Sequence, residues 1–220
     1  MKYSKEQIRK AMLLYAVTDQ SWLKEEATLL DVVKDLLKNG ATFLQIREKD
    51  LTEVDFETEA KKLQDICKVY NVPYVVNDNV EVAMRIDADG VHVGQSDIKG
   101  RDIRAMIGED KILGISAGTV EEAIAAEQAG ADYIGVGAIF GTSTKKNARN
   151  MTMDRLNEII KSVNIPVVAI GGINASNMSE LKGSGVDGVA VVSAIFAAEN
   201  PGQATKELLM KANDVVNGNE

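Results

Sequence analysis

The sequence predicts an α/β fold, a single (β/α)8 TIM barrel of residues 1–220 with an extra N-terminal helix. The first observation is a set of eight short apolar, β-branched runs that each end in a polar or glycine-rich tail. These runs cover residues 13–19, 43–50, 74–79, 90–97, 112–119, 133–142, 167–174 and 188–196. The second observation is the helical periodicity of the stretches between them. Parallel strands need such crossovers, and eight alternating units close into a barrel whose chemistry lies at the carboxyl ends of its strands.

The helices are expected in regular order along the chain. Ser4 and Gln7 fit a capping box that opens a short helix before the first strand. Apolar residues from Leu29 to Leu37 give the next helix its buried stripe, and Gly40 is placed to end it. The remaining helices are predicted at 56–69, 80–86, 101–107, 120–129, 152–163, 176–183 and 203–216.

Three acidic steps precede strands four, six and eight. They are DADG at 87–90, GADY at 130–133 and GVDG at 185–188. We interpret them as tight turns at the amino-terminal end of the barrel, where residues serve stability rather than function.

Composition limits the classes of function. The chain is 45% hydrophobic and 26% charged, as in an ordinary globular protein, and its net charge of −8 argues against a nucleic-acid partner or an anionic membrane surface. The early apolar run Ala11–Val17 is too short for a signal or membrane segment, and Cys67 is expected to be a buried core thiol. We therefore expect a cytoplasmic protein without nucleic-acid or membrane partners, and a homo-oligomer is compatible with the sequence.

The second strand ends in the sequence QIREKD. Gln45, Arg47 and Lys49 alternate with apolar Leu44 and Ile46, so the polar three share one face of the strand. In a barrel the apolar face turns toward the helices, which directs the polar face inward. An amide and two cations at the barrel mouth form an anion clamp. The alternative, a solvated run of charges, does not account for this alternation.

Acidic residues end the next two strands. Asn77 and Asp78 end the third strand and Asp97 ends the fourth, so the two carboxylates can share one ion. Two carboxylates with open positions suit Mg²⁺, which keeps water ligands and binds substrate phosphate. The alternative is that each aspartate caps the helix that follows it.

The fifth strand ends at Ser116, whose hydroxyl could donate to a phosphate oxygen. Ser116 or Thr119 could equally cap the next helix, because Glu121 and Glu122 follow in its first turn. His92 lies inside the fourth strand, where a core residue or a residue supporting the site is the favoured interpretation and a general base has no support.

A second phosphate site is predicted from the last three strands. The loop after the sixth strand carries Thr142, Ser143, Thr144 and Lys145, a composition that suits a lid over phosphate, although an ordinary polar loop is the alternative. The seventh strand ends at Gly171 and Gly172, and the eighth at Val192 and Ser193. Loops after these two strands form the recurrent phosphate site of TIM barrels.

The ordered set of tails resembles the thiamine-phosphate synthase family, also called thiamine-phosphate pyrophosphorylase. The motifs that carry the resemblance are QIREKD, VVNDNVEVA, DGVHVGQSD, LGISAGT, DYIGVGAIFGTSTKKNA, AIGGIN and GVAVVSAIF, in family order across residues 43–196. The family is a transferase that joins 4-amino-2-methyl-5-(diphosphooxymethyl)pyrimidine to 4-methyl-5-(2-phosphoethyl)thiazole. Its products are thiamine phosphate and pyrophosphate.

The resemblance implies a role for each site residue. Arg47, Lys49, Asn77, Ser116 and Lys145 would hold the pyrimidine diphosphate with Gln45 beside them, and Arg47, Lys49, Ser116 and Lys145 would be catalytic. Asp78 and Asp97 would bind Mg²⁺, and the thiazole phosphate would lie against Thr142, Ser143, Thr144, Gly172, Val192 and Ser193. The implied route is dissociative: pyrophosphate leaves first and the thiazole nitrogen captures a pyrimidinylmethyl cation. Gly118, Ala138 and Gly141 depart from the family pattern, and none is a predicted metal or phosphate ligand.

Three other functions fit a phosphate-binding barrel. A related thiazole tautomerase would not need the complete set of cations and carboxylates seen here. A catalytically silent regulatory barrel would tolerate loss of the carboxylate pair. An unrelated barrel isomerase would need a carboxylate or lysine base deep in the mouth, and the sequence offers no obvious candidate.

Overall fold

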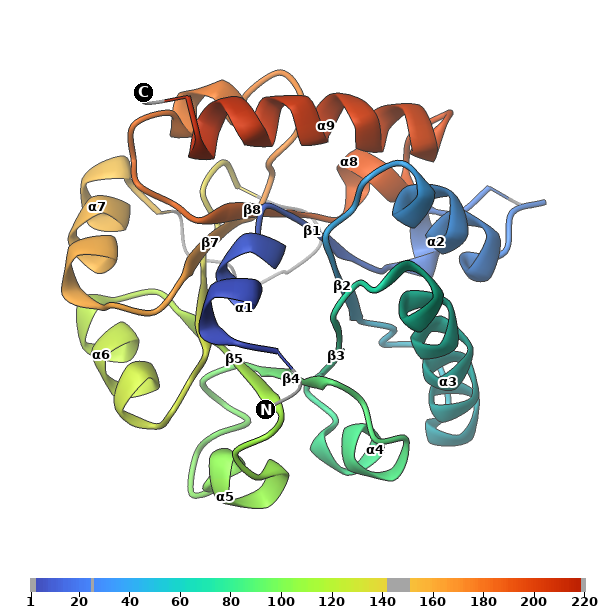
Figure 1. Ribbon diagram of the computed structural model, residues 1–220, viewed down its shortest axis with the longest axis horizontal. Coiled ribbons are helices and arrows are strands. Elements are labelled where there is room, and N and C mark those ends of the chain that lie inside the picture. Colours follow the sequence, from blue (N-terminus) through green and yellow to red (C-terminus); the bar gives the residue numbers. More distant parts are fainter. Residues whose placement is uncertain (1–2, 25, 142–150, 219–220) are drawn as a thin grey trace.

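Eight parallel strands close into a barrel in the computed structural model, which describes residues 3–24, 26–141 and 151–218 (Figure 1). Each strand pairs with its neighbours in sequence, and β8 pairs with β1. The strands are β1 (Leu14–Val17), β2 (Phe43–Ile46), β3 (Tyr74–Asn77), β4 (Gly90–Val93), β5 (Ile112–Ala117), β6 (Tyr133–Val136), β7 (Val167–Ile170) and β8 (Gly188–Val191). The predicted TIM barrel is confirmed.

Helices surround the barrel on its outside, as Figure 1 shows. They are α1 (Lys5–Ala11), η1 (Gln20–Trp22), α2 (Leu29–Lys38), α3 (Glu53–Tyr70), α4 (Val80–Arg85), α5 (Ile103–Ile107), α6 (Val120–Gln128), α7 (Met153–Ser162), η2 (Met178–Leu181), α8 (Ser193–Phe196) and α9 (Pro201–Val216). None of these described helices has the length and apolarity needed to span a membrane.

Two predicted elements are wrong in detail. The helix expected at 176–183 is only the 3-10 turn η2, because the Asn174 carboxamide oxygen accepts the backbone N–H of Ser176 at 2.9 Å and competes with a helical first turn. The apolar run at 188–196 is not one strand. It ends as a strand at Val191 and continues as the short helix α8.

The core has two layers. The outer layer lies between strands and helices and includes Leu44 and Ile46. The inner layer fills the barrel and includes Tyr15, Phe43 and Tyr133. Ile8 of α1 belongs to the inner layer, and Figure 1 shows α1 lying across the centre of the barrel. The extra N-terminal helix therefore closes one end of the barrel and leaves the other as the mouth.

The closed end is tied together by a repeated hydrogen bond. The residue before each even-numbered strand accepts a backbone N–H from the first or second residue of the preceding odd-numbered strand. Asp89 accepts from Tyr74 at 3.1 Å, and Asp132 accepts from Leu113 at 2.8 Å. Asp187 accepts from Val167 and Thr42 accepts from Leu14, both at 2.8 Å. The acidic steps predicted at 87–90, 130–133 and 185–188 thus join neighbouring strands, with Thr42 as a fourth case.

Candidate active site

A cavity of about 550 Å³ occupies the open end of the barrel, at the carboxyl ends of the strands. Its volume is typical of a small-molecule site. All ten predicted site residues that the structure describes line this cavity: Gln45, Arg47, Lys49, Asn77, Asp78, Asp97, Ser116, Gly172, Val192 and Ser193. The other four, Thr142, Ser143, Thr144 and Lys145, lie outside the described residues.

The residues of the predicted anion clamp at the end of β2 have the orientation that the alternation predicted. Gln45 turns into the barrel, where its Nε2 donates to the Tyr15 hydroxyl at 2.5 Å, while Leu44 and Ile46 pack in the outer core. The Arg47 side chain is only 13% exposed, and its Nη1 lies 3.7 Å from an oxygen of Asp19.

The tail of the first strand supports this clamp, a role that the sequence did not reveal. The Arg47 backbone N–H donates to the Thr18 hydroxyl at 2.9 Å, and the Thr18 N–H donates to the Gln45 carbonyl at 2.9 Å. The Gln20 N–H donates to Glu48 Oε2 at 2.9 Å. These contacts fix β1 and β2 against each other directly below the two cations.

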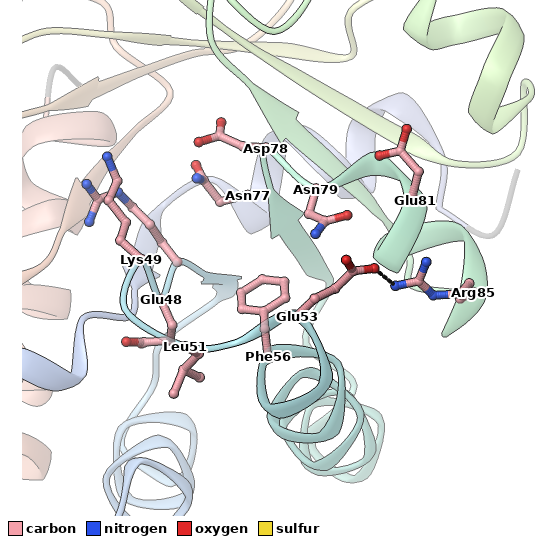
Figure 2. A pocket seen from close by; sticks show the side chains of 11 residues that line it. Glu48, Lys49, Leu51, Glu53, Phe56, Asn77, Asp78, Asn79, Glu81 and Arg85 are labelled. Atoms are coloured by element: carbon pink, nitrogen blue, oxygen red, sulfur yellow. Dashed lines mark hydrogen bonds and ion pairs between the residues drawn. The ribbon is translucent and has the colours of Figure 1, made fainter.

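Glu48 is a buried carboxyl group within the clamp sequence. Burial raises its pKa, and the other oxygen, Oε1, has no hydrogen-bond partner among the described residues. Glu48 borders a second cavity of about 710 Å³ between the β2 tail and helices α3 and α4. Figure 2 shows Glu48 pointing toward Leu51 and away from Asn77 and Asp78. Glu48 therefore supports the backbone around the site and does not line the cavity at the mouth.

Asp78 and Asp97 meet at the mouth. Burial, followed by the nearby Asp97 charge, raises the pKa of Asp78. The backbone holds Asp78 at a positive φ of 61°, with its N–H donating to the His92 carbonyl at 2.8 Å. A strained backbone and a carboxyl group whose pKa is raised by burial and a neighbouring carboxylate are typical of a functional site.

Neither aspartate caps a helix, which decides the alternative left open by the sequence. Asn79 caps α4 and Asp102 caps α5, whereas Asp97 accepts the Gly94 N–H at 2.8 Å within the β4 tail.

The pair suits a hard divalent cation. Two adjacent carboxyl groups repel as anions, and a cation between them removes that repulsion. The described part of the chain holds no group of three or more acidic, histidine or cysteine side chains that could bind one metal ion, so water and substrate oxygens would complete the coordination. This is the coordination that Mg²⁺ prefers with phosphate substrates.

Ser116 faces the cavity and contacts the histidine. Its Oγ lies 3.0 Å from His92 Nε2, and His92 Nδ1 lies 2.9 Å from the Tyr133 hydroxyl. Thr119, not Ser116, caps α6 by accepting the Glu122 N–H at 3.1 Å. Of the two uses that the sequence allowed for Ser116, the helix cap is therefore wrong.

The mouth beside β7 and β8 is shaped by glycine. Gly171 and Gly172 have positive φ values of 101° and 69°, and a Cβ on Gly172 would lie 2.0 Å from the Gly141 carbonyl oxygen. The Asn177 amide donates to the Gly172 carbonyl at 2.9 Å and fixes the turn. Glycine lets the backbone N–H groups of this turn approach a ligand closely, and Ser193 at the start of α8 lies beside them. This arrangement is suited to a phosphate group.

Comparison with known proteins decides the family. A model described as thiamine monophosphate synthase matches residues 14–195. The chain belongs to this family. It is 50% identical over 196 residues to the thiamine-phosphate synthase of Methanobrevibacter smithii, a match that covers 89% of this chain and 93% of that protein. It is 48% identical over 195 residues to the thiamine-phosphate synthase of Clostridium botulinum, covering 89% and 91%.

A solved structure of a thiamine phosphate pyrophosphorylase from Pyrococcus furiosus has the same fold. It superposes with a TM-score of 0.86 at 38% identity and covers 95% of this chain and 99% of its own. The membership in the thiamine monophosphate synthase family and the transferase role in thiamine biosynthesis, both predicted from the sequence, are confirmed.

Proposed function

We propose that this chain joins the pyrimidine diphosphate to the thiazole phosphate, giving thiamine phosphate and pyrophosphate by a dissociative substitution. The observation that carries the proposal is the convergence of a cationic clamp, a carboxylate pair and a glycine-shaped turn on one cavity of about 550 Å³. Two anion-binding subsites in one cavity would match two phosphorylated substrates. A silent regulatory barrel gives no reason for two adjacent aspartates beside the clamp.

In this proposal the clamp receives the diphosphate of the pyrimidine. Arg47 and Lys49 place positive charge against it, and Asn77 and Ser116 donate hydrogen bonds to it, with Gln45 beside the ring. These groups stabilise the negative charge that develops as the bond to the pyrimidinylmethyl carbon breaks. No strong base is needed, because the thiazole nitrogen attacks the resulting cation with its own lone pair.

Asp78 and Asp97 would hold Mg²⁺. A bound Mg²⁺ would supply further positive charge to the leaving diphosphate. Lys49 lies close enough to the pair for its charge to lower the pKa of Asp78, against the larger effects that raise it. The clamp and the carboxylates therefore border the same small volume, as shared binding of one diphosphate requires.

The thiazole phosphate would bind at the other side of the mouth. Gly172, Val192 and Ser193 border the cavity there. Thr142, Ser143, Thr144 and Lys145 are proposed to complete the two subsites from the loop after β6. Binding the thiazole here holds its nitrogen near the pyrimidine carbon, so that positioning replaces a chance encounter.

The test is a coupling assay with purified protein, Mg²⁺ and both phosphorylated substrates. We expect thiamine phosphate and pyrophosphate in equal amounts, and loss of both when a chelator removes Mg²⁺. Full activity in excess chelator would overturn the metal assignment. Isomerisation of the thiazole without coupling would favour the tautomerase. The cytoplasmic location, the homo-oligomer and the single-domain assignment stay predictions.

A further inference from the structure

An interior hydrogen-bond chain crosses the barrel beneath the candidate site. It runs from Gln45 to Tyr15 (2.5 Å), to Tyr133 (2.7 Å), to His92 (2.9 Å) and to Ser116 (3.0 Å). Its two ends, Gln45 and Ser116, are predicted substrate residues from β2 and β5. The three residues between them come from β1, β6 and β4 and have no role in the proposed reaction.

Two glycines provide the space that this hydrogen-bond chain occupies inside the barrel. A Cβ on Gly114 would lie 2.2 Å from Tyr133 Cζ and 2.6 Å from His92 Nδ1. A Cβ on Gly135 would lie 3.2 Å from His92 Cε1. Glycine stands at both positions on β5 and β6, where the tyrosine and histidine rings cross the interior. Any side chain at Gly114 would push the two rings out of hydrogen-bond contact.

The hydrogen-bonding capacity of Tyr15 sets a direction for the whole chain. Gln45 Nε2 can only donate, so the Tyr15 oxygen accepts there and its own proton must find another acceptor. Tyr15 is 2% exposed, and its other partner is the Tyr133 oxygen. If Tyr133 also donated to Tyr15, the Tyr15 proton would be buried without an acceptor among the described residues. That arrangement is costly, so Tyr15 donates to Tyr133.

The remaining protons follow from this first step. Tyr133 is fully buried, and burial holds its pKa well above the ordinary value, so it keeps a proton to donate to His92 Nδ1. His92 then carries its own proton on Nε2 and donates it to Ser116 Oγ. The Ser116 hydroxyl accepts from His92, and its proton is left to point into the cavity that Ser116 borders.

We propose that Tyr15, Tyr133 and His92 are positioning residues that hold the Ser116 hydroxyl as a hydrogen-bond donor toward an anionic oxygen in the mouth. The inference rests on the proposed function in one respect: the acceptor is an oxygen of the diphosphate. Without the chain, the serine hydroxyl could rotate and donate to His92 instead of the ligand.

The test is a double-mutant cycle in the full-length protein. Ser116→Ala and Tyr133→Phe are made singly and together, and calorimetry measures the affinity for pyrophosphate with Mg²⁺. Ser116→Ala should weaken binding about ten- to hundredfold, the loss expected for a hydrogen bond to a charged acceptor. Tyr133→Phe should weaken it by up to about tenfold. In the Ser116→Ala background, Tyr133→Phe should change affinity less than about twofold, because the residue acts through the serine.

Tyr74→Phe is the matched control. Tyr74 is also fully buried on a barrel strand, but its hydroxyl has no hydrogen-bond partner among the described residues. Its loss should leave pyrophosphate affinity unchanged in both backgrounds. Tyr15→Phe is the second variant in case Tyr133→Phe does not fold, and it should show the same dependence on Ser116.

The outcomes separate this inference from the proposed function. Equal effects of Tyr133→Phe with and without Ser116 would mean a structural role and overturn the inference, as would a wild-type protein that does not bind pyrophosphate. Dependence on Ser116 in a protein that makes no thiamine phosphate would support the inference and refute the proposed function. In the coupling assay, Tyr133→Phe should lower kcat and leave the KM for the thiazole phosphate unchanged.

Discussion

Asp132 at the closed end of the barrel offers the sharpest test of the division between stability and function. Its Oδ2 accepts the Leu113 N–H at 2.8 Å and pairs with Arg104 Nη2 at 2.7 Å. The side chains of the pair are 7% and 11% exposed for Asp132 and Arg104. Asp132→Ala would leave both the amide and the guanidinium without this partner in a nearly dry environment.

The cost follows from these contacts. An unpaired buried N–H costs about 1–3 kcal/mol, and breaking a buried ion pair costs about 3–5 kcal/mol. Arg104 keeps hydrogen bonds to the carbonyls of Gly130, Gly108 and Lys111, which limits the second cost. We expect Asp132→Ala to lower the free energy of unfolding by about 3 kcal/mol.

Asp187→Ala is the matched comparison. Asp187 accepts the Val167 N–H at 2.8 Å, as Asp132 accepts from Leu113, but its partner Arg9 is 46% exposed. An exposed pair contributes only about 0–1 kcal/mol, so this variant should lose about 1–2 kcal/mol, mostly from the amide.

Urea denaturation measures both losses, and the coupling assay measures activity at a temperature where both variants are folded. Each should keep wild-type kcat/KM within about twofold, since the mouth lies at the opposite end of the barrel. A loss below about 1 kcal/mol for Asp132→Ala, an equal loss in the two variants, or a folded variant with little activity would refute the reasoning.

Three further predictions concern the mouth. Asp78→Asn should lower the rate of pyrophosphate release at least about 10²-fold and abolish its dependence on Mg²⁺, while Asp102→Asn, which alters only the cap of α5, should leave the rate unchanged. Glu48→Gln should raise the stability of the fold near pH 7. Burial raises the pKa of Glu48 in the folded protein, so its ionisation destabilises the fold as pH rises above the ordinary glutamate range. Glutamine cannot ionise and removes this cost. The melting temperature of the variant relative to wild type should therefore rise between pH 4 and pH 7, and an unchanged difference would contradict the burial argument. Gly172→Ala should raise the KM for the thiazole phosphate and cost more stability than Gly183→Ala, because both have positive φ but only Gly172 would bring a Cβ against backbone, 2.0 Å from the Gly141 oxygen. Gly183→Ala should lower the free energy of unfolding by only about 1–2 kcal/mol, the cost of backbone strain alone. Equal losses in the two variants by urea denaturation would contradict the close approach at Gly172.

The sequence predicted the mouth well because strand ends have a simple geometry. The alternation of Gln45, Arg47 and Lys49 with apolar residues was enough to turn them inward, and the order of β3 and β4 was enough to bring Asp78 and Asp97 together. Both inferences need only the two-residue period of a strand and the parallel order of a barrel. Neither requires knowledge of side-chain contacts.

The parts that the sequence missed depend on contacts across the barrel. Tyr15 and Tyr133 are 118 positions apart and received no role from the sequence, yet their hydroxyls are hydrogen-bonded at 2.7 Å. Thr18 and Asp19 contact Arg47 from the end of β1, the one strand to which the sequence assigned no site role. The 3-10 turn at Met178–Leu181 was read as a helix because periodicity ignores the asparagine side chains that compete for its backbone.

The net charge of −8 and a cationic mouth are compatible because of where the charges are paired. On the rim, Arg85 is bound to Glu53 and Glu57, which removes its charge from the field of the site. Lys49, in contrast, makes no salt bridge with any residue that the structure describes, and it borders both the cavity that Arg85 lines and the cavity of the candidate site. At the mouth, the positive charge of Lys49 is thus left without a salt bridge where an anion is proposed to bind. The local field at the mouth, rather than the sign of the whole protein, is what an incoming diphosphate encounters at short range.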